Sequence, residues 1–186
     1  MLAPREKLWP AHPLLVEAAL DMLAVSGPEC LVADFGCGDG PALFGAAARG
    51  CRAIGWEVHQ ARAAALAAEV QARGLSGSIT VIAGNALEAD FDAPGASVPS
   101  HVYLYLIARG LRLMLPTLRL LAARQPSGTL PVVTALYSIE GLTPVEVRRV
   151  TTGEGVRTPL YLYSVAAAEA AGSSSTQGEA EGVEKV

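Results

Sequence analysis

The segment LVADFGCGDG holds the first residues whose types and spacing could do chemistry. Gly36, Gly38 and Gly40 alternate after a short apolar run, and such glycines let a ligand approach the backbone closely. Asp34 and Asp39 flank them. A turn that binds a pyrophosphate has the spacing G-x-G-x-x-G. Carboxylates would repel that ligand by about 4 kcal/mol for each pair of charges about 4 Å apart at an effective dielectric constant of about 20. The segment therefore predicts a positively charged ligand.

Two further polar residues follow the next two apolar runs, Glu57 in IGWEV and Asn85 in IAGNA. A carboxylate at Glu57 can accept hydrogen bonds from both hydroxyls of a ribose, in NAD as well as in other nucleosides. The amide oxygen of Asn85 can accept from an adenine amino group, and the backbone N–H of Ala86 can donate to a ring nitrogen. A nucleoside that carries positive charge is S-adenosylmethionine, which we predict as the cofactor, with no metal.

Each of these residues also has a simpler interpretation. Asp39 could favour the N-terminus of the next helix, Glu57 could be a surface acid, and Asn85 could be a turn residue. We interpret Cys37, inside the glycine turn, as a small filler, because its Asp neighbours would raise the pKa of the thiol. The glycine turn, Asp39, Glu57 and Asn85 occur in this order, each after an apolar run, and their spacing fits one nucleoside. This favours one pocket formed by all four.

Alternating elements must position these residues. Apolar periodicity predicts a helix at about residues 12–26, and helices are expected between the strands of the first part of the chain. A proline should kink or divide the helix around Pro116, and Pro131 should lie near a strand start or on an edge. Strands are predicted at CLVADFG, CRAIGWEV, SITVIAGN, HVYLYLI and TLPVVTALYSI, with late candidates at PVEVRRV and PLYLYSV. The alternation predicts an α/β fold, a Rossmann-like three-layer sandwich with a mostly parallel sheet and an antiparallel edge strand. Ligands bind such sheets at the carboxyl ends of the strands.

The length of 186 residues indicates one domain, which we place at residues 1–165. Its cofactor-binding half is expected at about residues 30–90 and its acceptor-side half at about residues 100–165. Residues 166–186 are rich in Ala, Ser, Gly and Glu, and are predicted to be a disordered tail.

The charge distribution argues against a nucleic-acid binder. The net charge is −4, and the tail alone carries −3, so the body is near neutral where nucleic acid would require a basic face. Four arginines near the middle of the chain could form either a solvated helix face or a face that docks the substrate, and we favour the solvated face: Arg109, Arg112, Arg119 and Arg124.

The remaining reactive residue types give weak signals. Cys30, Cys37 and Cys51 show no metal-binding or disulfide spacing, which fits a reducing compartment. We assign no general base to His12, His59 or His101. No apolar run reaches the ~18 residues of a membrane span, and the N-terminus lacks a signal-peptide core. A soluble intracellular protein, in the cytoplasm, is the plain expectation.

The glycine turn, as D-x-G-x-G-x-G, and the acid Glu57 resemble a class I S-adenosylmethionine-dependent methyltransferase over about residues 12–165. The segments DFGCGDG, GWEVHQARA, VYLYLIARGLRLMLPTLRLL, VVTALYSIEGLTP and LYLYSV are similar to the ATP synthase c-subunit lysine N-methyltransferase family. That resemblance implies a small enzyme that methylates protein lysine, a protein substrate with an acceptor lysine, and a mitochondrial location. It also implies cofactor contacts from Asp34, Gly36, Asp39, Glu57 and Asn85.

The resemblance further places Tyr103, Tyr105 and Leu106 where the acceptor nitrogen meets the methyl group. We expect Tyr103 and Tyr105 to point to opposite faces of their strand, and we assign Tyr105 to the pocket as the catalytic residue. The sequence departs from the family pattern at several positions: Pro41, His59, Ile107-Ala108, Ala135 and Leu136. Three functions are weighed: a protein-lysine methyltransferase, a methyltransferase for a small molecule or RNA, and a degenerate methyltransferase fold that serves as a scaffold.

Overall fold

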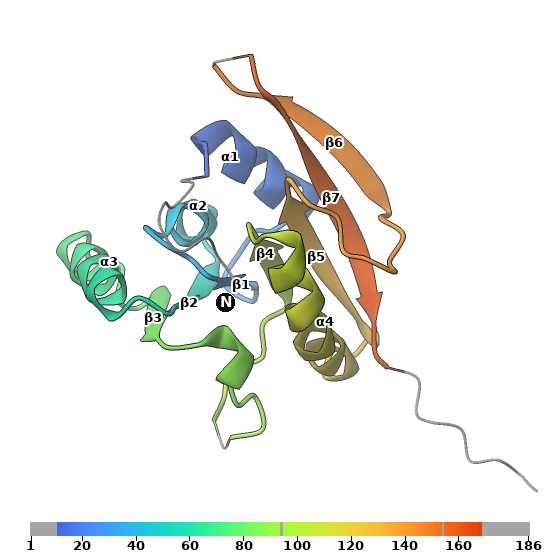
Figure 1. The fold of residues 1–186 in the computed structure, drawn as a ribbon. Coiled ribbons are helices and arrows are strands. Elements are labelled where there is room, and N and C mark those ends of the chain that lie inside the picture. The colour runs from blue at the N-terminus through green and yellow to red at the C-terminus, as the bar shows by residue number, and fades with distance from the viewer. Residues whose placement is uncertain (1–10, 94, 154, 169–186) are drawn as a thin grey trace, which may run out of the picture.

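The computed structural model describes residues 11–93, 95–153 and 155–168, and shows one seven-stranded sheet between helices (Figure 1). The helices are α1 (Pro13–Met22), α2 (Pro41–Ala48), α3 (Gln60–Ala72), the 3₁₀ turn η1 (Ala86–Glu88) and α4 (Ala108–Ala123). The strands are β1 (Leu31–Phe35), β2 (Arg52–Glu57), β3 (Ile79–Ala83), β4 (His101–Leu104), β5 (Thr129–Ala135), β6 (Glu146–Thr151) and β7 (Arg157–Ala166).

The strand order is β3-β2-β1-β4-β5-β7-β6. The first five strands in this order pair in parallel, and β7 pairs antiparallel with both β5 and β6. The chain starts in the middle at β1, moves outward to β3, and returns to the other side of β1 at β4. The order therefore reverses between β1 and β4, which is the place where ligands bind open α/β sheets. The predicted fold class is confirmed.

Both faces of the sheet are covered, which explains why the central strands β1 and β2 are buried at every position except Arg52. Residues of α1, α2 and α3 pack on one face with Val32 and Val133. Residues of α4 pack on the other face with Ala33 and Val132. Neighbouring residues in a strand thus contribute to opposite cores, and the three-layer arrangement follows.

The two prolines behave differently. Pro131 lies near the start of β5, before the pairing of that strand with β4 begins at Val132, as predicted. Pro116 does not divide its helix, because α4 is one element from Ala108 to Ala123. Pro116 is exposed, so water can bond the carbonyl that it leaves without an N–H partner. Buried residues on both sides of it, Leu111 and Leu118 among them, anchor the two halves of the helix to the same core.

The helix predicted at about residues 12–26 is present but ends at Met22, close to Ala24, whose φ is +52°. His12 caps its first turn, since its Nδ1 accepts from the N–H of Leu14 at 3.2 Å. Three of the four arginines on α4 and after it are exposed, as expected of a solvated face: Arg109, Arg112 and Arg119. Arg124 pairs with Asp92.

At the other end of the chain, β7 runs to Ala166, and residues 169–186 of the expected tail lie outside the described residues. Within the described part of the chain, no helix is long and apolar enough to cross a membrane.

Candidate functional site

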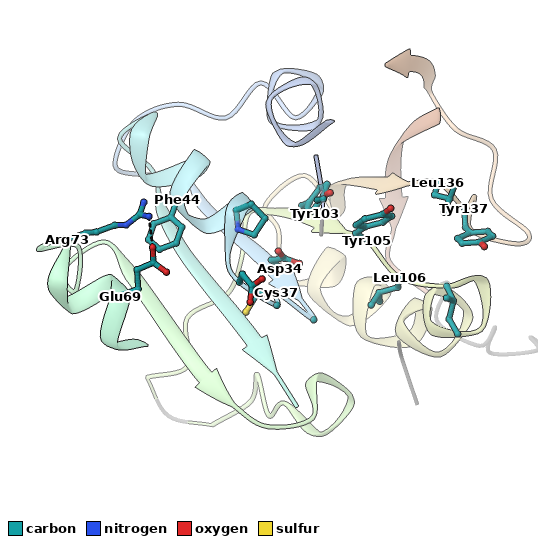
Figure 2. Close-up of a pocket in the computed structure, with 16 residues that line it drawn as sticks. Asp34, Cys37, Phe44, Glu69, Arg73, Tyr103, Tyr105, Leu106, Leu136 and Tyr137 are labelled. Carbon is teal, nitrogen blue, oxygen red and sulfur yellow. Dashed lines mark hydrogen bonds and ion pairs between the residues drawn. The ribbon is translucent and has the colours of Figure 1, made fainter. Parts of the chain in front are cut away.

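A cavity of about 380 Å³ lies where the carboxyl ends of β1 and β4 meet the glycine turn, residues 34–40. Its volume falls in the range of small-molecule sites. Figure 2 shows Asp34 and Cys37 between Tyr103, Tyr105 and Tyr137 on one side and Phe44, Glu69 and Arg73 on the other. The remaining lining residues are Ala11, Gly36, Gly38, Asp39, Pro41, Leu106, Ile107 and Leu136. The cavity therefore joins a polar turn to an aromatic and apolar wall.

The glycine turn has a backbone that only glycine adopts easily. Gly36, Gly38 and Gly40 have φ of +100°, +55° and +75°. The N–H groups of Gly36 and Cys37 donate to the carbonyl of Trp56 at 2.8 and 3.0 Å. These bonds tie the turn to the end of β2, so its shape is fixed before any ligand arrives.

Cys37 packs beneath this turn and is almost fully buried. Its pKa is raised well above the ordinary value, first by burial and then by the charges of Asp34 and Glu57. Both features agree with the interpretation of Cys37 as a small filler. Gly55, on β2, faces it, and a Cβ there would lie 2.7 Å from the Cys37 Sγ and 2.6 Å from Leu43 Cδ1. Sequence reasoning missed Gly55, although a glycine inside a buried strand is a recognised sign of close approach.

Asp34 is the most perturbed acid at the site. It is 4% exposed and pairs in register with Tyr103 on the neighbouring strand. Its pKa is raised to about 8, first by burial and then by the charge of Glu57, and no hydrogen bond from the described residues opposes that rise. A positive charge beside it would favour the ionised form, because opposite charges stabilise each other most where water is excluded.

Asp39 and Glu57, the other two acids of the predicted pocket, differ from each other in exposure. Asp39 lines the cavity, is largely exposed, and lies 3.6 Å from Arg62 across an ion pair. Glu57 is buried and its carboxylate accepts from the N–H of Gly38 at 3.0 Å and of His59 at 2.8 Å. Glu57 is therefore not a surface acid, and in this structure it holds the middle of the glycine turn from below.

Asn85 and Ala86 lie apart from Asp34. Asn85 begins η1, where its Oδ1 accepts from the N–H of Leu87 at 3.1 Å and its Nδ2 donates to Glu88 at 2.9 Å. Ala86 is buried. Asn85 lines a second hollow of about 530 Å³ together with Trp56 and Phe91. The structure thus gives Asn85 the turn role weighed for it, and an adenine contact stays a prediction.

Tyr103 and Tyr105 both line the first cavity, so the expectation that they point to opposite faces is wrong. Residues two apart in a strand point to the same face. The Tyr103 hydroxyl is buried and has no hydrogen-bond partner among the described residues. Burial, followed by the charge of Asp34, raises its pKa. Burial, followed by Tyr137, raises the pKa of Tyr105. Both phenols therefore stay neutral near pH 7.

A strained turn completes the aromatic wall. Leu136 has a φ of +72°, which is uncommon for a bulky residue, and the N–H of Tyr137 donates to the carbonyl of Ala135 at 2.9 Å. This is a rare γ-turn with positive φ, at a cost on the order of 1–3 kcal/mol. The Thr134 hydroxyl donates to the Tyr137 carbonyl at 2.6 Å and fixes it. Sequence reasoning noted Leu136 only as a departure, since nothing in a leucine signals a positive φ.

Comparison with known proteins gives similarities in sequence and in fold. No family model matches the chain. It is 28% identical over 164 residues to a protein-lysine N-methyltransferase of Saccharolobus islandicus, a match that covers 87% of this chain and 95% of the relative.

Among solved structures, an RNA methyltransferase from Salinibacter ruber in complex with S-adenosyl-L-homocysteine superposes with a TM-score of 0.71 and 22% identity. The match covers 85% of this chain and 94% of that one. Geranyl diphosphate C-methyltransferase from Streptomyces coelicolor A3(2) superposes with a TM-score of 0.59 and 16% identity, over 81% and 74% of the two chains. The chain therefore has the Rossmann-like fold of these methyltransferases.

Proposed function

We propose that this chain is an S-adenosylmethionine-dependent methyltransferase that acts on a lysine side chain of a protein. The observation that carries the proposal is the buried carboxyl of Asp34, which has no partner from the described residues and lies beside a glycine turn at the reversal of strand order. Burying such a group costs stability unless a ligand pairs with it. The similarity to a protein-lysine N-methyltransferase of Saccharolobus islandicus supports the choice of acceptor.

The residues of the cavity fit a cofactor that has a sulfonium and an ammonium group. Asp34 and Asp39 would hold its positive charges, and the Tyr103 hydroxyl oxygen, which has no partner among the described residues, can accept from the ammonium. Glu57 retains acceptor capacity for the ribose hydroxyls, because each carboxylate oxygen that binds an N–H has a second lone pair.

The rest of the predicted cofactor site is built from backbone and small side chains. Gly36, Gly38 and Gly40 would let the cofactor approach the turn, and Cys37 would support it by packing. Asn85, which lines the second hollow, and the neighbouring Ala86 would contact the adenine. The cofactor would thus span the carboxyl ends of β1, β2 and β3.

The chemistry of transfer belongs to the cofactor, which when bound supplies a methyl group activated by a sulfonium. The chain has to orient the acceptor in line with that group, and such alignment can lower a barrier by about 7–11 kcal/mol. Tyr105 lies just beyond the end of β4 and lines the same cavity as Asp34, so we assign it the contact with the acceptor nitrogen.

A lysine acceptor must lose its proton before it attacks. Leu106 and Leu136 supply apolar walls, which lower the pKa of an amine by removing it from water. The rings of Tyr105 and Tyr137 can hold the ammonium form by cation–π contact, while the neutral phenol oxygen of Tyr105 can accept from its N–H. Tyr137 is partly exposed, and a site open at this point suits an acceptor that is presented by a protein segment.

An RNA acceptor is the second candidate, because the superposed Salinibacter ruber protein is an RNA methyltransferase. The near-neutral body of this chain favours protein over RNA. A small-molecule acceptor and a scaffold without activity are further alternatives, the latter favoured by the departures at Pro41, Ala135 and Leu136.

The test is to incubate the purified chain with methyl-labelled cofactor and a cell lysate, and then to separate protein, RNA and small molecules. Label in protein that appears as N-methyl-lysine after acid hydrolysis supports the proposal. An Asp34→Asn variant should lose the label. An Arg119→Ala variant, altered at an exposed position on α4 outside the cavity, should keep it.

Label confined to RNA or to small molecules would overturn the lysine acceptor and leave the methyltransferase activity standing. Calorimetry with the cofactor alone tests the alternative that the chain is a scaffold without activity. If millimolar cofactor releases no heat of binding and no fraction is labelled, the methyltransferase proposal itself is wrong.

A further inference from the structure

The amino-terminal end of the parallel strands holds a second cluster of reactive side chains, far along the strands from the glycine turn. Cys30 immediately precedes β1, Cys51 immediately precedes β2, and Ser100 immediately precedes β4, which begins at His101. None of these residues lines either cavity. The cofactor site of the proposed function therefore leaves this cluster unexplained.

The two cysteines are neighbours across adjacent strands. Leu31 pairs in register with Arg52, and the N–H of Arg52 donates to the carbonyl of Cys30 at 2.9 Å, so the register continues to Cys51. Both side chains belong to the same core, on the face covered by α1 and α2. Adjacent strands lie about 4.8 Å apart. Disulfides join Cα atoms that are about 4.4–6.8 Å apart. The backbone spacing therefore permits a bond between the two sulfurs.

A base lies within reach of one of these thiols. The Nδ1 of His101 is 3.1 Å from the Sγ of Cys30 and 2.9 Å from the Oγ of Ser100. Burial lowers the pKa of His101, so its imidazole is neutral near pH 7 and can accept the thiol proton. A thiol hydrogen-bonded to an imidazole is the arrangement that activates cysteine as a nucleophile.

We propose that Cys30 and Cys51 form a thiol pair which hydrogen peroxide converts to an intramolecular disulfide. Cys30, deprotonated by His101, attacks one peroxide oxygen and becomes a sulfenic acid, and the other oxygen leaves as hydroxide and takes up the proton as water. The sulfur of Cys51 then attacks the sulfenic sulfur and expels a second water. In total, two thiols and one peroxide give one disulfide and two waters.

This chemistry suits the cluster better than the alternatives. Of the two thiols, Cys30 is the one that lies 3.1 Å from an imidazole nitrogen, so Cys30 attacks first and Cys51 resolves the sulfenic acid. A metal site is not favoured, since no group of three His, Cys, Asp or Glu within residues 11–93, 95–153 and 155–168 has the geometry to hold an ion.

The bond would have one structural consequence. It would close a loop that contains the whole glycine turn and all of α2, since these lie between Cys30 and Cys51 in the chain. A cross-link of this kind restricts the unfolded chain most, and should leave the native cavity in place. The proposal does not depend on the proposed function.

The test is to treat the full chain with hydrogen peroxide and map its cysteines by mass spectrometry. Trypsin together with a protease that cleaves before Asp separates the three cysteines, because Asp34 lies between Cys30 and Cys37 and arginines flank Cys51. We expect the peptide holding Cys30 joined to the peptide holding Cys51, with Cys37 still free. All three thiols left free, or a disulfide that joins two copies of the chain, would overturn the proposal.

Two variants sharpen the test. His101→Gln should slow disulfide formation several-fold while thermal melting shows that the protein remains folded, and an unchanged rate would remove His101 from the proposal. Cys51→Ser should stop at the sulfenic acid on Cys30, which a dimedone probe detects. If either variant fails to fold, the peptide map of the unaltered chain still decides the matter.

Discussion

The two ends of the same parallel strands differ in how completely particular polar side chains are paired. At the carboxyl end, the Tyr103 hydroxyl is buried without a hydrogen-bond partner among the described residues, and burial raises the pKa of Asp34, which lines the cavity. At the amino end, the Ser100 hydroxyl accepts from the N–H of Leu31 at 3.0 Å and lies 2.9 Å from the Nδ1 of His101. Both ends belong to the same strands, so the difference reflects the loops and side chains at each end and not the sheet itself.

The comparison teaches that the cavity is assembled at the expense of stability. An unpaired buried polar group costs about 1–3 kcal/mol, and more when it is charged. Such groups persist when a ligand completes them, and the γ-turn at Leu136 adds strain at the same end of the sheet. Removing a polar group at the carboxyl end should therefore reduce binding with little loss of stability, and removing one at the amino end should do the reverse.

The largest effect is expected for Asp34→Asn. The variant should bind the cofactor about 100-fold more weakly, since loss of a charged partner in a buried site costs about 3 kcal/mol. The free protein should melt several degrees higher at pH 7, because the unfolded chain no longer gains from ionising this residue. Calorimetry and thermal melting measure the two effects. A variant that melts lower and binds normally would contradict the contrast between the ends.

The second-largest effect is expected for Gly55→Ala. Its Cβ would lie 2.6 Å from Leu43 Cδ1 and 2.7 Å from the Cys37 Sγ, so the glycine turn must shift. We expect a loss of about 1–3 kcal/mol in the free energy of unfolding together with weaker cofactor binding. Gly77→Ala, where nothing lies within 4 Å of the added Cβ, is the matched control and should change neither quantity.

The pH dependence tests the same carboxyl without a substitution. The pKa of Asp34 is 3.8 in a model compound and about 8 in the folded chain, so between these values the native state keeps a proton that the unfolded chain releases. This contribution to stability is fully present below pH 4 and falls as pH rises toward 8, by up to about 1.4 kcal/mol for each pH unit. Cofactor affinity should rise over pH 6 to 8, because a cation needs the ionised form. Denaturant unfolding across this range measures the first trend. Asp34→Asn should abolish both trends.

The smallest effects are expected from removing a single hydroxyl group at either end of the strands. Tyr103→Phe should keep or slightly raise stability, because it removes an unpaired buried hydroxyl, and should lower cofactor affinity by a few-fold. Ser100→Ala should cost about 1 kcal/mol of stability and leave affinity unchanged, since it removes made hydrogen bonds far from the cavity. The same sign of stability change in both variants would remove the distinction between the two ends.

The sequence was sufficient for the fold because the signals for it are local. Apolar runs predicted the five parallel strands, the two late candidates correspond to β6 and β7, and the reversal of order places the turn at residues 34–40 beside the cavity. The roles of individual side chains depended on contacts across the sheet, which no local pattern contains. Glu57 reaches Gly38, nineteen positions earlier in the chain, and Cys30 reaches His101, seventy-one positions later. The shared face of Tyr103 and Tyr105 was predictable, and the alternation of a strand should have shown it.

The placement of β7 between β5 and β6 leaves β6 on the outside of the sheet, where no strand of the described residues neighbours one side of its backbone. Such an edge invites a further strand from another molecule. Glu146, Arg148 and Arg149 lie along β6, and a strand that added there would have to desolvate their charges. The order of the last strands thus creates an opportunity for polymerisation, and the charges on β6 act against it.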